Sequence, residues 1–249
     1  MSTFVIVHGA WGGGWEWSEV ASRLQARGHR VLTPTLTGLG ERSHLAVGKR
    51  IGLSTHVDDI VAVVEFERLE QVVLCGASYG GMAVTGAADR LGDPIRAVVY
   101  VDALVPTDGQ CALDLLPAPF GEVVRRGLAE HGDHWRILLP AALRDALIPP
   151  GALADDVRVA YLARLRDHPA ATFTDPLHLT GPVDEMPRSF VRCTAAEFGD
   201  EVGGDPVAAS AARARAQGWP YRELATRHDP QVFEPERLAA LLEELGALA

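Results

Sequence analysis

Residues 72–82 read VVLCGASYGGM, and this stretch predicts the fold of the whole chain. Its first four residues are apolar and strand-forming, and the small-residue segment that follows has helical character. Between them lie Gly76, Ser78 and Gly80, in the pattern G-x-S-x-G. A serine in so sharp a turn takes strained dihedral angles, and glycine two positions away on each side leaves the necessary room. The stretch therefore predicts a strand, a tight turn and a helix, with the Ser78 hydroxyl raised above a sheet.

The pattern G-x-S-x-G between a strand and a helix is a nucleophile elbow. The turn brings the backbone N–H of the next residue, Tyr79, to a helix N-terminus, where it can stabilise an oxyanion. Ser78 is therefore a candidate nucleophile and Tyr79 a candidate oxyanion donor. The alternative interpretation is a glycine-rich turn in which the serine has no chemical role.

Length, charge and cysteine content narrow the class of protein. The 249 residues, 47% of them hydrophobic, suffice for one α/β domain with an insertion. The net charge of −10 argues against nucleic acid and anionic membranes as partners, because a polyphosphate requires a basic face. Three cysteines without ligand-like spacing predict neither a disulfide framework nor a zinc site. The N-terminus predicts neither a signal peptide nor a membrane helix, so we expect a cytoplasmic protein.

The order of the predicted elements indicates a doubly wound, mostly parallel sheet with active groups at the carboxyl ends of its strands. From 106 to 187 prolines cluster between short apolar segments, which predicts a helical cap inserted between core strands of a single domain, 1–249. We expect helices that start with Ser18 as N-cap and with a capping pair of Thr55 and Asp58. The expected core strands are 4–7, 30–33, 72–75, 97–101, 189–193 and 221–225.

His228 is the candidate base. A serine hydroxyl is a poor nucleophile at neutral pH unless an imidazole takes its proton. His228 directly follows the last predicted strand, and it preserves the chain order nucleophile, acid, histidine. The alternative is a histidine in a solvated loop.

The carboxylate that orients this histidine has two candidate positions. Asp102 ends the apolar strand that follows the elbow helix, where a buried charge requires a partner. Glu197, Asp200 and Glu201 follow the next core strand, the more usual position for the acid, in a segment rich in glycine and acids. We favour Asp102 and retain Glu197 as the alternative acid.

The loop after the first strand is expected to supply the second oxyanion donor, the backbone N–H of Ala10. Trp11 in this loop, with Phe120 and Trp135 in the cap, provides apolar surface for a substrate pocket. These aromatic side chains can equally be packing residues. No nucleotide-binding or metal-ligand pattern is present, so we expect neither a cofactor nor a metal.

Several motifs together resemble the α/β-hydrolase superfamily, in particular the branch of esterases and hydroxynitrile lyases that includes plant methyl-ester esterases. The stretch TLTGLGERSH at 35–44 is similar to bacterial proteins of that branch. The other motifs are HGAW at 8–11 followed by GGWEW, GASYGG at 76–81, ELATRHDP at 223–230 and PERLAALL at 235–242.

The resemblance implies roles for four residues: Ser78 as nucleophile, His228 as base, and Ala10 and Tyr79 as oxyanion donors. YVDAL, which contains Asp102, also resembles the strand end of haloalkane dehalogenases whose acid follows the sixth strand. The position usual for the acid in the wider family corresponds to Glu197, so the resemblance leaves the acid open.

The activity that the resemblance implies is hydrolysis of a carboxylic ester, or a related acyl bond, of a small hydrophobic substrate through an acyl-enzyme. One alternative is a cofactor-free lyase that uses the same serine and histidine. Ala10 stands where such lyases carry a threonine, which disfavours that alternative. The other alternative is a non-catalytic ligand-binding relative. The sequence leaves open the acyl and alcohol groups and the oligomeric state, including a homodimer.

Overall fold

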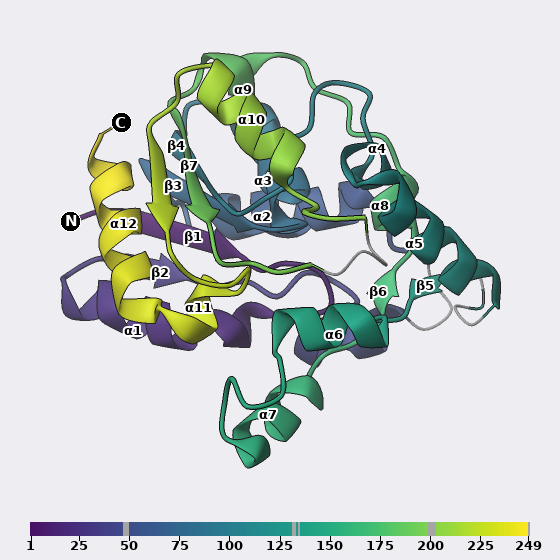
Figure 1. The fold of residues 1–249 in the computed structure, drawn as a ribbon. Helices are drawn as coiled ribbons and strands as arrows, with labels where there is room; N and C mark the ends of the chain where they lie inside the picture. Colours follow the sequence, from purple (N-terminus) through teal and green to yellow (C-terminus); the bar gives the residue numbers. More distant parts are fainter. Residues whose placement is uncertain (47–49, 131–132, 134, 199–202, 249) are drawn as a thin grey trace.

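The computed structural model describes residues 1–249 except 47–49, 131–132, 134, 199–202 and 249. In this described part, one sheet has six strands in the order β2-β1-β3-β4-β7-β8, and every neighbouring pair is parallel (Figure 1). This confirms the predicted doubly wound α/β architecture. The strands are β1 (Thr3–Val7), β2 (Arg30–Leu32), β3 (Val72–Ala77), β4 (Ile95–Val101), β7 (Arg188–Cys193) and β8 (Tyr221–Leu224).

Helices cover both faces of the sheet, which explains why its strands are apolar runs rather than alternating patterns (Figure 1). In β1, Phe4 and Ile6 join the core under one layer of helices, whereas Val5 and Val7 join the core under the other. Full burial of such a side chain stabilises the fold by roughly 1.5–3 kcal/mol. One layer contains α1 (Ser18–Ala26) and α12 (Pro235–Ala247); the other contains α2 (Leu53–Phe66), α3 (Gly80–Leu91) and α10 (Ala208–Ala216).

Two predicted helix starts were wrong by a few residues. Ser18 is the first residue of α1, and the N-cap is Trp17, which makes no side-chain capping bond. α2 begins at Leu53, because the extended Gly52 caps it and its carbonyl accepts the Thr55 N–H at 3.1 Å. Backbone geometry, rather than a capping side chain, therefore starts both helices.

The chain between β4 and β7 forms a helical insertion, and α5, α6 and α7 project away from the sheet in Figure 1. The range 106–187 expected for the cap falls in this insertion, and its independence as a cap stays a prediction. A short antiparallel pair, β5 (Arg136–Ile137) with β6 (His168–Pro169), ties the insertion together. Its helices are α4 (Ala112–Leu115), α5 (Ala118–Glu130), α6 (Ala141–Leu147), α7 (Asp155–Leu162), α8 (Ala171–Thr174) and α9 (Pro182–Glu185).

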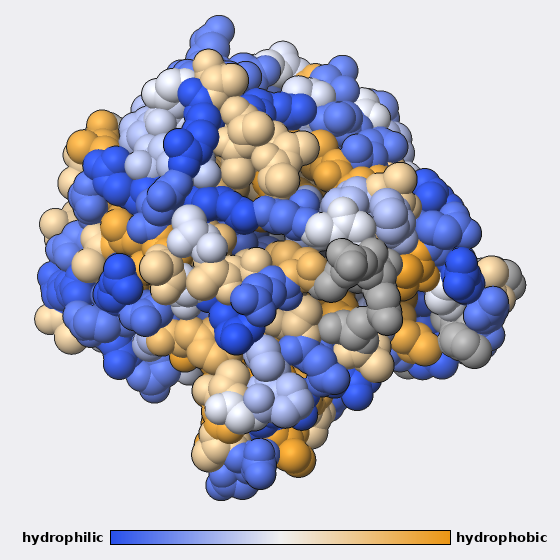
Figure 2. Space-filling model, viewed as in Figure 1, coloured by the Kyte–Doolittle hydropathy of each residue, from blue (hydrophilic) through white to orange (hydrophobic). Residues whose placement is uncertain are grey.

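Apolar residues gather in a band across the middle of the face shown in Figure 2, between α10 and α6, and hydrophilic residues cover much of the rest. Among the described residues, no helix combines the length and the apolar character needed to cross a bilayer. Three short helical segments complete the fold near the sheet: η1 (Gly14–Trp17), η2 (Gly40–Ala46) and α11 (Pro230–Phe233).

Candidate functional site

Ser78 occupies the turn between β3 and α3 with φ = 50°, in the left-handed region that L residues rarely adopt. Glycine is required around it because the backbone packs too closely for any side chain. A Cβ on Gly76 would lie 2.8 Å from the carbonyl oxygen of Gly80, and one on Gly80 would lie 2.6 Å from that of His8. A Cβ on Gly81 would lie 2.0 Å from the carbonyl oxygen of Leu104. The glycines of the elbow therefore allow the strained turn that exposes the serine hydroxyl.

His228 meets this hydroxyl from the far end of the chain. It lies in the loop between β8 and α11, is 9% exposed, and its Nε2 lies 2.9 Å from Ser78 Oγ. The two residues are 150 positions apart in sequence. The parallel sheet brings them together, because the carboxyl ends of β3 and β8 lie at the same end of the sheet.

Asp102 completes a chain of hydrogen bonds. It follows β4 with φ = 43°, is fully buried, and its Oδ2 lies 2.7 Å from His228 Nδ1. With His228 Nδ1–H donating to the carboxylate, Nε2 is left free to accept the Ser78 O–H. Glu197, the alternative acid, is exposed in the loop after β7. Asp200 and Glu201 lie outside the described residues.

Arg192 of β7 balances the buried charge of Asp102. Its Nη1 donates to Asp102 Oδ1 at 2.5 Å, and its other terminal nitrogen donates to Asp205. The backbone N–H of Cys193 donates to the same Oδ1 atom at 3.1 Å. Sequence analysis missed Arg192, although an arginine within an apolar core strand is itself a signal, because its charge requires a buried carboxylate.

Burial by itself lowers the pKa of His228, because it disfavours the charged imidazolium. The hydrogen bond and negative charge of Asp102, with smaller contributions from Asp229 and Asp205, outweigh burial and raise the pKa of His228 above its ordinary value. The site therefore stabilises a proton on this imidazole, as a general base that receives one requires.

The two candidate oxyanion donors are the N–H groups of Ala10 and Tyr79, residues that line the cavity together with Ser78. Tyr79 is the N-cap of α3; its ring stacks on Phe173, its hydroxyl lies 2.9 Å from His56 Nδ1, and both Tyr79 and Phe173 line the cavity. Ala10 lies in the loop after β1, next to Gly9, where a Cβ would lie 3.1 Å from Ser78 Cβ. Within the described residues, neither the Ala10 N–H nor the Tyr79 N–H donates to another protein group.

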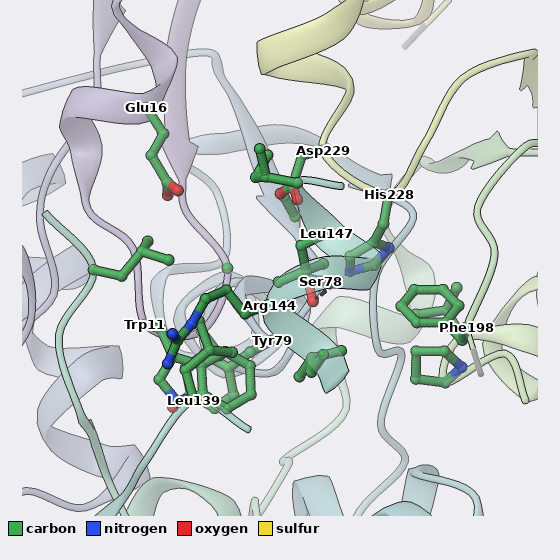
Figure 3. Close-up of a pocket in the computed structure, with 18 of the residues that line it drawn as sticks. Trp11, Glu16, Ser78, Tyr79, Leu139, Arg144, Leu147, Phe198, His228 and Asp229 are labelled. Carbon is green, nitrogen blue, oxygen red and sulfur yellow. Dashed lines mark hydrogen bonds between the residues drawn. The ribbon is translucent and has the colours of Figure 1, made fainter. Parts of the chain in front are cut away.

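A largely apolar cavity opens above Ser78, between the core and the helical insertion (Figure 3). Trp11 and Phe120 line it, as expected. The Trp11 indole N–H donates to the Ile137 carbonyl at 3.0 Å, which ties this wall to β5 of the insertion. The other apolar side chains that line the cavity include Leu104, Leu116, Leu139, Leu143, Leu147, Ile148, Leu162, Leu165, Phe173 and Val207.

The expectation that Trp135 lines the pocket was wrong. Its side chain is 39% exposed and is absent from the cavity wall. The ring instead lies beside the guanidinium of its neighbour Arg136, whose Cζ is 5.5 Å from the ring centroid. In β5, the side chain that turns inward is Ile137, which is 1% exposed.

Sequence analysis also missed a polar group in this cavity, formed by Glu16, Tyr161, Asp229 and Gln231. Glu16 is the charged residue in the otherwise aromatic and glycine-rich GGWEW, and Asp229 directly follows His228. Among the described residues, no group of three or more histidine, cysteine or acidic side chains is arranged to hold a metal ion.

The α/β-hydrolases are a class in which a serine on a strained turn lies above a mostly parallel sheet. The serine is hydrogen-bonded to a histidine that follows the last strand. The chain belongs to the alpha/beta hydrolase family, whose family model matches residues 4–241.

The chain spans about half the length of two curated relatives that it matches. A carbendazim hydrolyzing esterase of Nocardioides sp. is 51% identical over 117 residues, 47% of this chain and 48% of the relative. The esterase PIR7B of Oryza sativa subsp. japonica is 33% identical over 131 residues, 51% of this chain and 46% of the relative.

Solved structures share the fold over nearly the whole chain. An extracellular α/β-hydrolase from a Paenibacillus species, described as sharing structural and functional homology with tobacco salicylic acid binding protein 2, superposes with a TM-score of 0.84 at 24% identity. That alignment covers 99% of each chain. A methylesterase from Arabidopsis superposes with a TM-score of 0.75 at 20% identity over 100% of each chain.

Proposed function

We propose that this protein is a serine hydrolase that cleaves a carboxylic ester, or a related acyl bond, of a small hydrophobic substrate through an acyl-enzyme. The observation that carries the proposal is the continuous set of hydrogen bonds from Asp102 through His228 to Ser78. Ser78 lines a largely apolar cavity. The relatives that are named esterases support the same class of reaction.

In the proposed reaction, His228 Nε2 takes the proton of the Ser78 hydroxyl as Oγ attacks the ester carbonyl carbon. Asp102 accepts the Nδ1–H, holds the required tautomer and stabilises the imidazolium that forms. His228 then returns the proton to the alcohol oxygen as the bond from the acyl carbon to that oxygen breaks. The products of this half-reaction are an acylated Ser78 and the free alcohol.

The N–H groups of Ala10 and Tyr79 hold the oxyanion of each tetrahedral intermediate. Neither N–H donates to another group among the described residues, which supports their availability to the oxyanion. In the second half-reaction, His228 takes a proton from the water that attacks the acyl carbon, and then returns it to Ser78 Oγ as the bond from the acyl carbon to Oγ breaks and the carboxylic acid leaves. None of these steps requires a cofactor, and the net charge of −10 favours a small molecule over a polyphosphate partner.

The experiment that tests this function is hydrolysis of p-nitrophenyl esters of graded acyl length, together with labelling by a fluorophosphonate probe. The wild-type protein is expected to hydrolyse short esters and to become labelled at Ser78. Ser78→Ala is expected to lose both labelling and at least a thousandfold of turnover. Full ester hydrolysis by a folded Ser78→Ala protein would refute the proposal.

A further inference from the structure

The cavity above Ser78 has an end that is rich in hydrogen-bond acceptors. Glu16 in η1 accepts the Gly13 N–H at 3.2 Å and the Tyr161 hydroxyl of α7. Asp229 Oδ1 accepts a hydrogen bond from Gln231 Nε2 at 3.0 Å. In Figure 3, the carboxyl groups of Glu16 and Asp229 both lie above Ser78, and both residues line the same cavity.

Gln231 contributes an acceptor atom to which no described residue donates a hydrogen bond. Its side chain lines the cavity and is 5% exposed, yet its Oε1 atom has no hydrogen-bond partner among the described residues. A carboxylate offers about four acceptor sites, and Glu16 has two of them filled. The missing groups at this end of the cavity are therefore donors.

A cation beside the two buried carboxyl groups at this end would favour their ionised forms. Burial, and secondarily the negative charge of Asp229, raises the pKa of Glu16 to about 8; burial also raises the pKa of Asp229. Within the described part of the chain, neither carboxyl group forms an ion pair with an arginine. Arg164 is the nearby cation, but its guanidinium lies 3.8 Å over the Trp15 ring, and Arg144 lines the cavity unpaired.

We propose that Glu16, Asp229 and Gln231 form a subsite for a protonated amine, so that the preferred substrate is an ester with a cationic N–H group remote from its scissile bond. This inference rests on the proposed ester hydrolysis and names the substrate class for it. A protonated amine supplies both the missing charge and the missing donor. The apolar remainder of the cavity suits the hydrocarbon between the amine and the ester.

The site also excludes other ligand classes. An ionised carboxylate or phosphate brings only acceptors to the Gln231 Oε1 acceptor, which lacks a donor, and this disfavours it. A permanently charged quaternary ammonium supplies the charge but no N–H, and the unpaired Gln231 Oε1 requires a donor. Tyr161 belongs to the insertion and Glu16 to the core, so the subsite spans the junction between the two.

The test compares three esters of matched shape: 3-(dimethylamino)propyl butyrate, its carbon isostere 4-methylpentyl butyrate, and 3-(trimethylammonio)propyl butyrate. Steady-state hydrolysis is measured for wild type, Glu16→Gln and the surface control Glu19→Gln, which removes the same charge from exposed α1. Dissociation constants are measured by calorimetry with Ser78→Ala and with Ser78→Ala/Glu16→Gln, so that binding is read even without turnover.

The wild type is expected to have a KM for the dimethylamino ester about tenfold below that for the carbon isostere, with the trimethylammonio ester between them. Glu16→Gln, which keeps an acceptor for Tyr161, is expected to raise the KM for the dimethylamino ester about tenfold relative to the KM for the isostere. Glu19→Gln is expected to match wild type.

Equal affinity for the dimethylamino ester and its isostere in the Ser78→Ala background would overturn the amine subsite. So would a preference that survives Glu16→Gln. If the wild type hydrolyses the isostere in a Ser78-dependent way without preferring the amine, the subsite is refuted and the ester hydrolysis stands. Selective binding of the amine without Ser78-dependent hydrolysis of any ester supports the subsite and refutes the hydrolase.

Discussion

At the scale of residues, three of the six non-glycine residues with positive φ in the described part of the chain lie at the candidate site. Trp11, Ser78 and Asp102 all adopt positive φ, at 63°, 50° and 43°. Such conformations each cost of order 1–3 kcal/mol and persist where the surroundings hold them. Here each strained residue directly follows or lies near the end of a core strand, so the strain turns a side chain or an N–H group toward the cavity.

We expect ester hydrolysis to increase with pH through the raised pKa of His228, because Nε2 must be unprotonated to accept the Ser78 proton. Asp102→Asn is expected to reduce kcat about 10⁴-fold. It is also expected to move the acidic limb of kcat/KM to lower pH, because burial then lowers the pKa of His228 without the opposing hydrogen bond and charge of Asp102. The measurement is a pH profile of kcat/KM for a p-nitrophenyl ester.

Glu197→Gln is the matched comparison for Asp102→Asn, because it neutralises the exposed alternative acid. Its profile is expected to coincide with that of the wild type. A greater loss of turnover in Glu197→Gln than in Asp102→Asn would contradict the assignment of the acid.

Arg192 is expected to tune the same titration. Its charge stabilises the ionised Asp102 and disfavours a proton on the Asp102–His228 pair. Arg192→Gln is therefore expected to shift the acidic limb of kcat/KM to higher pH and to lower turnover at pH 7. Arg222→Gln, which removes an exposed ion pair with Glu244 on the adjacent strand, serves as the control. A shift to lower pH in Arg192→Gln would show that the arginine does not act through Asp102.

At the scale of elements, the strand, turn and helix from β3 to α3 could be predicted from the glycine pattern, because each glycine there answers a local steric demand. The starts of α1 and α2 could not be predicted, since Trp17 and Gly52 cap them through backbone geometry. Trp135 was misplaced for a related reason: two-residue β5 is too short for its pattern to show which side chain faces the core.

Gly81→Ala tests the close approach of the elbow to the segment after β4. The added methyl would lie 2.0 Å from the Leu104 carbonyl oxygen, and Leu104 also donates its N–H to the Ser78 carbonyl at 3.0 Å. We expect the free energy of unfolding to fall by roughly 3 kcal/mol and ester hydrolysis to fall with it. Urea denaturation and steady-state kinetics measure the two effects.

The control for Gly81→Ala is Gly127→Ala in α5, where a Cβ meets nothing within 4 Å. There alanine is expected to raise the free energy of unfolding by roughly 0.5–1 kcal/mol, because it favours the helix and restricts the unfolded chain. Equal effects of the two substitutions would mean that the elbow is not tightly packed.

At the scale of the whole molecule, three histidines other than His228 are buried among the described residues, two in the core and one, His168, in the insertion, where its ring contacts that of His56. His56 of α2 lies between the Thr37 carbonyl and the Tyr79 hydroxyl, at 2.9 Å from each. His168 of β6 accepts the Trp11 N–H at 3.2 Å, and His8 accepts the Leu36 N–H at 3.1 Å. Burial lowers the pKa of all three, to about 4 for His8 and for His56.

Because the native state lowers the pKa of these histidines, we expect the free energy of unfolding to depend on pH. Below the ordinary histidine pKa the unfolded chain takes up protons that the native state excludes, so stability falls as pH falls from about 6.5 toward 4. His56 is expected to contribute about 2 kcal/mol to the loss of unfolding free energy between pH 7 and pH 5. His56→Gln is expected to be less stable at pH 7 and to lose about 2 kcal/mol less over this interval.

Urea denaturation at pH 7, 6 and 5 provides the measurement, and His44→Gln, at an exposed position of η2, is the control. His44→Gln is expected to follow the wild-type pH dependence. An unchanged pH dependence in His56→Gln would show that this histidine titrates alike in the native and unfolded states.

The amino-acid sequence by itself determined the class of fold and the turn that carries the candidate nucleophile Ser78, because the apolar runs and the glycines around Ser78 act over short distances along the chain. It also placed His228 after the last strand. Only the tertiary structure decided between Asp102 and Glu197 as the partner of His228, since Asp102 and His228 are 126 residues apart. The same holds for the acceptor-rich end of the cavity, where Glu16 and Tyr161 meet across 145 residues. Such contacts depend on how the insertion packs against the sheet, and that packing is a property of the whole chain.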